Sequence, residues 1–495
     1  MNTEARLLCR RDIPWLVMLL GLGVSCRLVQ ISQPFIDAWS WRQADVAMIA
    51  ENFYRHGFRL LYPQINWAGN GPGYVGTEFP LVPFIASLLY IGFGVHEWVG
   101  RAVSVFFFAV SVPFFYLLVR KIANTRSALL AVGIYICTPL GIYTSRSFMP
   151  DIASLSLSIA ALYLFAEWLE HERAPWFFTG VCLTTSLAIL IKLPAVIIGV
   201  PLLYMAWSKY GVQLVVRREL WAFAVLSLLL PMAWYVHAYY LSVRHFPYHF
   251  FGTGGLQIKD WGWYMAILHW TVIESLTPIV FGAMLIGSMV PSHAPLGRVF
   301  HWWLLALLLF VWLAGQGNRH QWYQLPIVPV AAAFGGLAGD CALRICIQTM
   351  GTKMAVVLCC MFYAVLAYLS YNSLKPLYAP QPQRVQAWHM GQALHTLAPA
   401  DALVVVADDG DPTALYYSRR KGWHFLRDGM FMGYPRDSQQ AIMQLEQWRT
   451  EGASYLGFTQ YAFWWFEYYT GFKEYLEARY QRVQETQDYL IFRLQ

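Results

Sequence analysis

The chain has 495 residues, of which 58% are hydrophobic and 13% are charged, whereas soluble domains carry about 25% charged residues. This composition excludes an ordinary soluble protein and predicts a chain that crosses a membrane several times. The net charge of +7 comes from the apolar part, since the last 124 residues hold 12 basic and 13 acidic side chains. We therefore read the charge as a topology signal and expect no nucleic-acid partner.

Eleven apolar segments between Ile13 and Tyr371 are about long enough to cross a hydrocarbon core of roughly 30 Å. The first, 13–31, is too long for a signal-peptide core and lacks a clear small-residue cleavage site, so we expect a retained helix. The others lie near 100–119, 127–144, 152–168, 176–191, 194–208, 219–241, 268–290, 299–315, 322–340 and 354–371.

The segment 80–95 decides the predicted topology. It is apolar but short and contains Pro80, Pro83, Gly92 and Gly94, so we expect it to lie in the membrane interface and not to span. The basic residues of the short loops then share the side of the N-terminus, as the positive-inside rule requires. These residues are Arg6, Arg10, Arg11, Arg120, Lys121, Arg126, Lys209, Arg217, Arg218, Arg298, Arg344 and Lys353. The N-terminus is predicted to be cytoplasmic, and the loop 32–99 and the C-terminal part to lie outside.

A shift in composition marks a domain boundary after Tyr371, because 25 of the 63 charged residues lie among the last 124. We expect a transmembrane domain, 1–371, with a long amphipathic outer loop, 32–99, and a soluble domain, 372–495. None of the eight cysteines lies in an outer loop or in the soluble domain, so that domain needs its own hydrophobic core.

The soluble domain is predicted to be α/β. Strands are expected at 402–407, 455–458 and 489–494, and Asp437 with Ser438 can cap a helix that ends before Gly452. Asp408, Asp409 and Asp411 could form a metal cluster, but we favour turn and capping roles for them.

The first outer loop opens with candidate chemistry. Asp37 precedes an amphipathic helix that is expected to end at Gly57, and Asp45 shares one helical face with Asp37. Arg42 is three residues before Asp45 and can pair with it. The alternative is that Asp37 caps the helix.

Further charges recur at the outer ends of the predicted spans. Glu78 follows the glycine-rich stretch 69–76, Arg146 and Asp151 flank a short loop, and Lys192 stands between two apolar segments. Structural alternatives are a mobile loop for 69–76, a helix cap for Asp151 and a snorkelling side chain for Lys192.

Another outer element begins with Arg319-His320 and continues to Tyr323-Gln324-Leu325-Pro326. Together the outer face presents carboxylates and cations around a predicted membrane-embedded cavity. Cations in such a place suit the phosphate of a lipid headgroup, and a carboxylate beside them suits removal of a proton from an attacking hydroxyl.

In order and spacing, these elements resemble the protein O-mannosyltransferase superfamily, the C-type (GT-C) membrane glycosyltransferases that include the lipid A aminoarabinose transferases. The resemblance covers about residues 13–340. It rests on Asp37 after the first apolar segment, Glu78-Phe79-Pro80, the basic turn Arg120-Lys121, the loop 146–151, Lys192-Leu193-Pro194 and Tyr323-Gln324-Leu325-Pro326. Two positions depart from the pattern: Ala38 stands where eukaryotic members have Glu, and Phe79 stands where aminoarabinose transferases have Lys.

The resemblance implies a polytopic helical fold of the GT-C type in a bacterial inner membrane. It also implies transfer of one sugar from a polyprenyl-phosphate sugar to a lipid, glycan or protein acceptor at the outer face, with inversion at the anomeric carbon. Asp37 would be the catalytic carboxylate, and Asp151 a second acid that orients acceptor or donor. Arg42, Arg146 and Lys192 would bind the lipid phosphate.

The remaining residues of the predicted substrate-binding set are Asp45, Glu78, His320 and Tyr323. The resemblance fixes no cofactor, since metal dependence varies in the superfamily, and Glu78 with His320 or with an outer-loop histidine could hold a divalent cation.

Two alternatives remain open from the sequence. A transporter would need an inverted repeat and helices broken near the bilayer midplane, and we find no paired Gly/Pro-broken segments in matching halves. An O-antigen ligase or polymerase would also act on lipid-linked sugars, but its large loop usually lies late in the chain.

Overall fold

The computed structural model describes residues 12–248, 250, 256–292, 294–315, 317–427 and 433–495. Arg6, Arg10 and Arg11, which entered the topology prediction, lie outside these residues. The chain divides into two compact units. Unit 1 comprises Met1–Ile31, Arg101–Tyr235 and Gly252–Pro376, and unit 2 comprises Ser32–Gly100, Val236–Phe251 and Leu377–Gln495.

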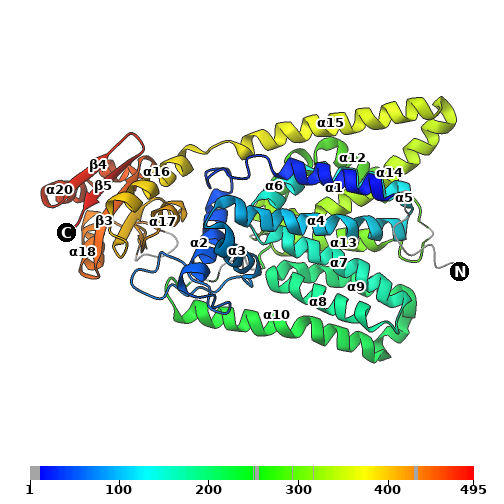
Figure 1. Ribbon diagram of the computed structural model, residues 1–495, viewed down its shortest axis with the longest axis horizontal. Helices are drawn as coiled ribbons and strands as arrows, with labels where there is room; N and C mark the ends of the chain where they lie inside the picture. Colours follow the sequence, from blue (N-terminus) through cyan, green and yellow to red (C-terminus); the bar gives the residue numbers. More distant parts are fainter. Residues whose placement is uncertain (1–11, 249, 251–255, 293, 316, 428–432) are drawn as a thin grey trace. The chain divides into compact units, whose positions relative to one another are not determined.

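Unit 1 is built from apolar helices, several of which run roughly parallel (Figure 1). They are α1 (Ile13–Arg27), α4 (Glu97–Ile122), α5 (Thr125–Cys137), α6 (Pro139–Arg146), α7 (Asp151–Glu170), α8 (Pro175–Ile191), α9 (Gly199–Tyr210), α10 (Arg218–Arg244, which runs on into unit 2), α11 (Trp261–His269), α12 (Pro278–Ser288), α13 (Val299–Leu313), α14 (Ile327–Met350) and α15 (Thr352–Tyr378). Short 3₁₀ turns are η2 (Leu193–Ile198), η3 (Gly211–Val216), η5 (Gly317–Arg319) and η6 (Gln321–Gln324), and η4 (Trp270–Leu276) is a π-helix.

Among the described residues, six helices are long and apolar enough to cross a membrane, and there are up to eight such spans if each of two bent helix pairs forms one. The pairs are α5 with α6, bent by 62°, and η4 and α11 with α12, bent by 102°. Each bend falls at a proline, Pro139 or Pro278, which starts the second helix because it cannot donate a backbone hydrogen bond. The helical membrane architecture is confirmed, and the count of eleven spans stays a prediction.

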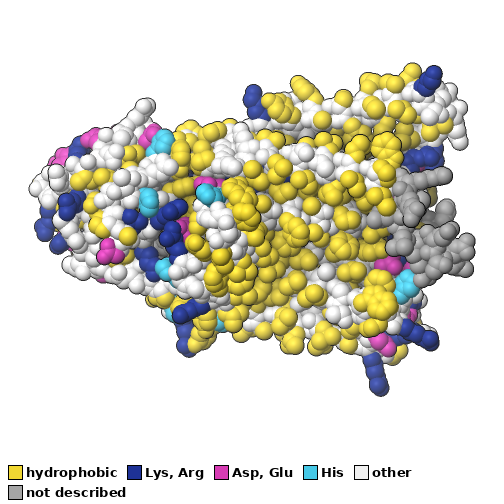
Figure 2. All heavy atoms as spheres, in the orientation of Figure 1, with side chains coloured by type: hydrophobic (Ala, Val, Ile, Leu, Met, Phe, Trp, Pro, Cys, Tyr) yellow, Lys and Arg dark blue, Asp and Glu magenta, His cyan; other side chains and the backbone are white. Residues whose placement is uncertain are grey.

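The helices of unit 1 pack closely where small residues face one another. α7 packs on α8, and α14 packs on both α5 and α12. A Cβ on Gly336 of α14 would lie 2.4 Å from the Ser127 carbonyl oxygen of α5. Only glycine fits at this crossing, as is common between membrane helices. Hydrophobic side chains cover much of the surface over these helices (Figure 2).

Unit 2 combines the first loop with the C-terminal sheet. Its helices are α2 (Ser40–His56), α3 (Leu81–Phe93), α16 (Pro382–Leu397), α17 (Thr413–Ser418), α18 (Ser438–Thr450), α19 (Trp465–Tyr468) and α20 (Thr470–Arg479), with the 3₁₀ turn η8 (Gln460–Ala462). Its strands are β1 (Leu403–Ala407), β2 (Lys421–His424), β3 (Ala453–Thr459), β4 (Gln481–Glu485) and β5 (Tyr489–Arg493).

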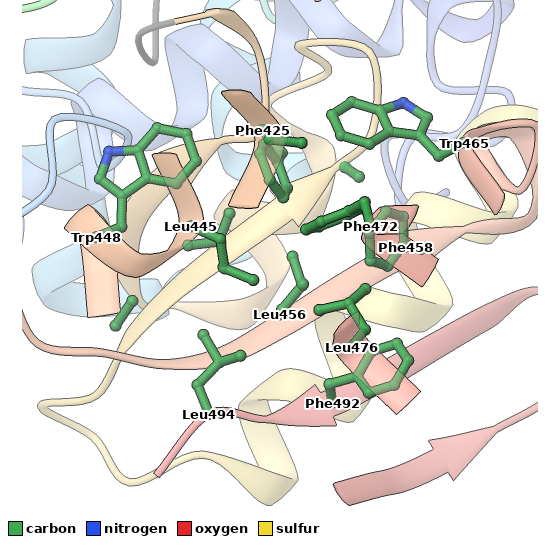
Figure 3. Packing of buried hydrophobic residues seen from close by; sticks show 14 of the residues in the cluster. Phe425, Leu445, Trp448, Leu456, Phe458, Trp465, Phe472, Leu476, Phe492 and Leu494 are labelled. Carbon is green, nitrogen blue, oxygen red and sulfur yellow. The ribbon is translucent and has the colours of Figure 1, made fainter. Parts of the chain in front are cut away.

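The strand order is β2-β1-β3-β5-β4. β2, β1 and β3 are parallel, with Val404 opposite Gly422 and Tyr455, whereas β5 is antiparallel to both β3 and β4. Aromatic and aliphatic side chains from the sheet, α18 and α20 form one core, in which Phe425 contacts Trp448, Trp465 and Phe472 (Figure 3). This core makes the domain independent of disulfides.

The predicted elements of the C-terminal domain are confirmed. The three predicted strands correspond to β1, β3 and β5, and Asp437 caps α18 by accepting a hydrogen bond from Gln440 N over 2.8 Å. β2 and β4 were not predicted. β2 has four residues, and β4 is polar and largely exposed, so neither has a clear alternating pattern.

Candidate functional site

Asp37 lies just before α2, and its side chain is fully buried. Gln43, in the first turns of α2, donates a hydrogen bond from Nε2 to Asp37 Oδ1 over 2.9 Å. The N-cap position of α2 is Trp39, so Asp37 does not cap this helix. Gln43 thus holds one oxygen of the buried Asp37 carboxylate.

Arg42 and Glu78 form a buried ion pair between the two ends of the first loop. Arg42 Nη2 lies 2.8 Å from Glu78 Oε2, and the side chains are only 10% and 6% exposed. Thr77 donates to the same oxygen over 3.0 Å. The sequence predicts a pair between Arg42 and Asp45 on one helix; the ion pair that the structure shows joins Arg42 to Glu78.

Asp45 lies one turn further along α2 and is 4% exposed. Burial raises the pKa of Asp45 to about 6 because the charged carboxylate loses its hydration. The positive charges of Arg42 and His424 oppose this shift, and the negative charge of Glu78 adds to it. A carboxyl group that titrates close to neutral pH is typical of a functional site.

The pair of His424 and Asp408 was not recognised from the sequence. His424 Nδ1 lies 2.8 Å from Asp408 Oδ1, and both side chains are 1% exposed. The Trp67 ring contacts the imidazole at a centroid distance of 5.2 Å. Asp408 follows β1 and also accepts a hydrogen bond from Gly410 N over 3.2 Å, as its predicted turn role requires. The one sequence signal was a buried strand that ends in an acidic residue.

Asp151 and Lys192 form the central ion pair of unit 1. Asp151 is the first residue of α7, Lys192 follows α8, and Nζ lies 2.7 Å from Oδ1, with side-chain exposures of 7% for Lys192 and 4% for Asp151. Lys192 Nζ also lies 4.5 Å from the ring centre of Tyr323. These three residues line a cavity of about 40 Å³ together with Ser154 and Trp322. Lys192 is therefore held inside the unit and does not snorkel.

Three fully buried arginines surround the C-terminal end of α1. Arg146 donates to the Gln30 carbonyl oxygen over 2.5 Å, and Arg101 donates to the Ile31 carbonyl oxygen over 2.9 Å. Arg27 donates to the carbonyl oxygens of Gly23 and Ile136 and to Ser145 Oγ, and its guanidinium lies 3.4 Å from the ring centre of Phe108.

Arg27 and Arg101 were missed by the sequence analysis. Each stands at the edge of an apolar helix, and that position was the available signal, because a buried arginine in a membrane segment is costly.

His320 stacks on Trp322 with ring centres 4.3 Å apart. Arg319 Nε lies 3.1 Å from His320 Nε2. His320 belongs to unit 1 and Glu78 to unit 2. The divalent cation predicted to bind Glu78 and His320 stays a prediction. Within the described residues, the group with metal-ligand spacing is Glu167, Glu170 and His171. Lys121 Nζ already lies 2.9 Å and 2.7 Å from its two carboxylates.

The predicted site residues thus fall into two sets. Unit 2 brings together Asp37, Arg42, Asp45 and Glu78 along α2 and the end of the first loop. Unit 1 brings together Asp151, Lys192 and Tyr323, and it holds Arg146 and His320 in separate contacts.

Comparison with known proteins gives a consistent picture. Residues 77–237 match the family model of dolichyl-phosphate-mannose-protein mannosyltransferases. An uncharacterized protein of Aquifex aeolicus (strain VF5) is 22% identical over 274 residues, which span 52% of this chain and 59% of that protein.

Two solved structures are similar over most of the chain. ArnT from Cupriavidus metallidurans bound to undecaprenyl phosphate is 14% identical, with a TM-score of 0.65, and the match covers 97% of this chain and 98% of ArnT. The archaeal oligosaccharyltransferase AglB from Archaeoglobus fulgidus, in complex with an inhibitory peptide and a dolichol-phosphate, is 14% identical, with a TM-score of 0.58. That match covers 96% of this chain and 72% of AglB. At such low identity the likeness shows a shared fold.

Proposed function

We propose that this chain is a C-type membrane glycosyltransferase, which the family match over residues 77–237 and the shared fold support. The reaction is transfer of one sugar from a polyprenyl-phosphate donor to a hydroxyl of a lipid, glycan or protein acceptor. We place it at the outer face of a bacterial inner membrane, with the N-terminus in the cytoplasm.

The nature of the donor is supported by what the similar structures hold. ArnT was captured with undecaprenyl phosphate and AglB with a dolichol-phosphate. Both ligands are the lipid phosphates that remain when a sugar leaves. A chain of the same fold, with buried cations in both of its units, is suited to the same class of donor.

The observation that carries the proposal is the buried carboxylate of Asp37, held at one oxygen by Gln43. We assign to Asp37 the removal of the proton from the acceptor hydroxyl. The acceptor oxygen then forms a bond to the anomeric carbon while the bond from that carbon to the phosphate oxygen breaks. Attack from the opposite face inverts the configuration, and the polyprenyl phosphate leaves with its electron pair.

We propose that Arg42, Arg146 and Lys192 stabilise the negative charge that grows on the leaving phosphate. Lys192 already contacts Asp151 and the Tyr323 ring. Asp151 is therefore proposed to orient the ammonium group, and Tyr323 to stabilise it through its ring face. Asp45 and Glu78 flank Arg42 and are proposed to set its position.

The test uses the purified full-length chain in proteoliposomes with polyprenyl-phosphate sugars and an envelope extract as acceptor. The intact chain is expected to release polyprenyl phosphate and to transfer the sugar. Asp37→Asn keeps the size of the side chain but loses the base, so its rate should fall by about 10²- to 10⁴-fold with an unchanged Tm. Activity within a few-fold of the unsubstituted chain would exclude Asp37 as the base. A parallel reaction with a chelator tests the predicted divalent cation.

A further inference from the structure

Unit 2 contains a polar cavity of about 420 Å³ whose lining includes none of the residues assigned to the proposed reaction. One wall is the C-terminal part of α2, with Glu51, Arg55 and His56, and another is formed by residues 400–403 and 419–421. The volume lies in the range of small-ligand sites. The cavity is therefore large enough for one sugar ring with a substituent.

The lining of this cavity is rich in positive charge. Arg55, Arg419, Arg420 and Lys421 all face it, against the two carboxylates of Glu51 and Asp401. Figure 2 shows Lys and Arg side chains gathered, with histidine among them, near α2 and α17. Arg55 Nε donates a hydrogen bond to Glu51 Oε1 over 2.6 Å, and Arg419 Nε lies 3.6 Å from the same oxygen. Four cations against two carboxylates leave a net positive wall.

Hydrogen bonds to backbone carbonyls hold the Arg420 side chain in this wall. Its residue is 7% exposed, and its Nη atoms donate to the carbonyl oxygens of His395 over 3.0 Å, Ala398 over 2.6 Å and Ser418 over 3.1 Å. Its buried Nε has no hydrogen-bond partner among the residues that the structure describes. Backbone carbonyls fix the guanidinium but do not cancel its charge, so Arg420 adds to the positive potential of the wall.

The pKa values of two titratable groups are lowered by burial and then by this positive charge. The pKa of His56 lies below its usual value because burial, and then the charges of Lys421 and Arg55, disfavour protonation. The pKa of Arg420 is lowered by burial and by Arg419 and Arg55. A bound anion would offset this repulsion.

Amide side chains complete the lining. Asn52 Nδ2 donates to Asn66 Oδ1 and to the Gln64 carbonyl oxygen, each over 2.9 Å, and Asn70 also lines the cavity. Amides pair with hydroxyl groups as both donors and acceptors, whereas a bare anion needs donors alone. The lining thus combines groups for an anion with groups for a polyol.

We infer that this cavity binds a saccharide that carries a phosphate monoester. The cations hold the phosphate, and the asparagines contact the ring hydroxyls. The binding itself stands apart from the proposed reaction. The role of the ligand as the acceptor, or as part of it, rests on the proposed glycosyl transfer.

The test is calorimetric titration of the purified full-length chain in detergent with glucose 6-phosphate. Binding is expected for glucose 6-phosphate and not for glucose, and it should weaken as salt is added. Lys421→Gln, and Lys421→Gln with Arg419→Gln, should each weaken binding by about tenfold or more, because each removes a charged contact. Lys473→Gln, a basic side chain of α20 outside the cavity, should bind as the unsubstituted chain does.

Several outcomes would overturn the inference. The first is that glucose 6-phosphate does not bind, and the second is that inorganic phosphate binds equally well. The third is that the Lys421 and Arg419 variants have a normal Tm and bind glucose 6-phosphate with unchanged affinity. Phosphatidylinositol 4-phosphate in mixed micelles separates the two sources of the ligand. If phosphatidylinositol 4-phosphate competes with glucose 6-phosphate, the ligand is a lipid headgroup. If it does not compete, the ligand is a soluble sugar phosphate. Because titration needs no turnover, its failure is distinct from failure of the transfer assay.

Discussion

Buried charge is concentrated on α2, where Arg42, Asp45 and Glu51 are each less than 9% exposed. Helices of ordinary domains rarely bury three ionisable side chains, because each loses its hydration. A chain that retains them gives up stability at these positions, as functional sites commonly do. The proposed phosphate contacts of Arg42 and the inferred cavity beside Glu51 both use this helix.

Asp45 provides a pH-dependent test at the scale of one residue. Its pKa of about 6 exceeds the value of about 3.9 in unfolded chains, so the folded state binds more protons between these pH values. The contribution of the Asp45 carboxyl to the free energy of unfolding is then greatest below about pH 4 and is lost as the pH rises through 6. The ionised carboxylate costs about 3 kcal/mol at neutral pH.

We therefore expect Asp45→Asn to raise the Tm in detergent at about pH 7.5, and to have little effect at about pH 4.5, where the carboxyl is already protonated. Differential scanning fluorimetry at both pH values measures this. Glu474→Gln, on the exposed part of α20, is the matched control and should not change the Tm. A Tm gain for Asp45→Asn that is the same at both pH values would contradict the raised pKa.

Lys192 tests the assignment of the phosphate. Lys192→Gln removes the proposed cation, so the KM for the lipid donor should rise by about tenfold or more, since a charged hydrogen bond contributes about 1.5–3 kcal/mol. Because the substitution leaves Asp151 buried, the double variant with Asp151→Asn serves as a check on folding. Lys353→Gln, at an exposed position of α15, is the control. An unchanged donor KM in a folded Lys192 variant would remove this residue from the phosphate site.

At the scale of elements, the first loop adds to the C-terminal sheet. Gly69 N donates to the Gly422 carbonyl oxygen over 2.8 Å, and Gly422 N donates to the Asn66 carbonyl oxygen over 2.9 Å. β2 is an edge strand, and the loop thus satisfies backbone groups that would otherwise be open to another chain. The wall of the inferred cavity depends on this pairing.

Gly69→Ala should disrupt that pairing. Gly69 has a φ of +56°, and an added Cβ would lie 2.2 Å from the Trp423 ring, so the variant is strained in both backbone and packing. We expect a lower Tm and faster proteolysis within 60–80. Gly92→Ala in α3, where an added Cβ meets nothing within 4 Å, should behave as the unsubstituted chain. Equal protease resistance of the two variants would show that the pairing contributes little.

The length of α3 bears on the topology of the whole molecule. Its 13 residues extend about 20 Å, which is too short for a hydrocarbon core of about 30 Å. The helices α1 and α13, which are predicted to span, have 15 residues each and are also shorter than this core. The interfacial position of α3 and the cytoplasmic side of the turn between α4 and α5 therefore stay predictions.

A cysteine at Ala123, in a variant without the native cysteines, tests that topology. This position is preferable to Asn124, whose side chain caps α5 by accepting from Ser127 N over 3.0 Å. We expect a membrane-impermeant thiol reagent to label Ala123→Cys only after the membrane is permeabilised, whereas Gly71→Cys in the first loop should react in intact cells. Labelling of Ala123→Cys from outside would reverse the predicted orientation and move the proposed reaction to the other face.

At the scale of the whole molecule, the residues proposed for the reaction are shared between two compact units. Asp37 and Arg42 belong to unit 2, and Arg146, Asp151 and Lys192 belong to unit 1. Unit 2 also joins the first loop with the C-terminal sheet. Most of the soluble domain predicted at 372–495 therefore lies in the same compact unit as the loop that carries the proposed catalytic base.

The sequence by itself determined the membrane helices and the α/β character of the C-terminal domain, and it indicated the superfamily that we propose. Hydropathy suffices for the helices, because a bilayer forces each spanning segment to satisfy its own backbone hydrogen bonds within one continuous apolar stretch. The position of Asp37 before α2 and the end of that helix at Gly57 followed from local patterns as well.

Only the tertiary structure decided which charges meet. Arg42 pairs with Glu78, 36 residues away, Lys192 pairs with Asp151 from another helix, and His424 pairs with Asp408 across two strands. The wall of Arg419 to Lys421 opposite α2 is likewise a product of packing. Periodicity reports only which neighbours share a face along one element, whereas the energy of a buried charge depends on partners that distant segments bring to it.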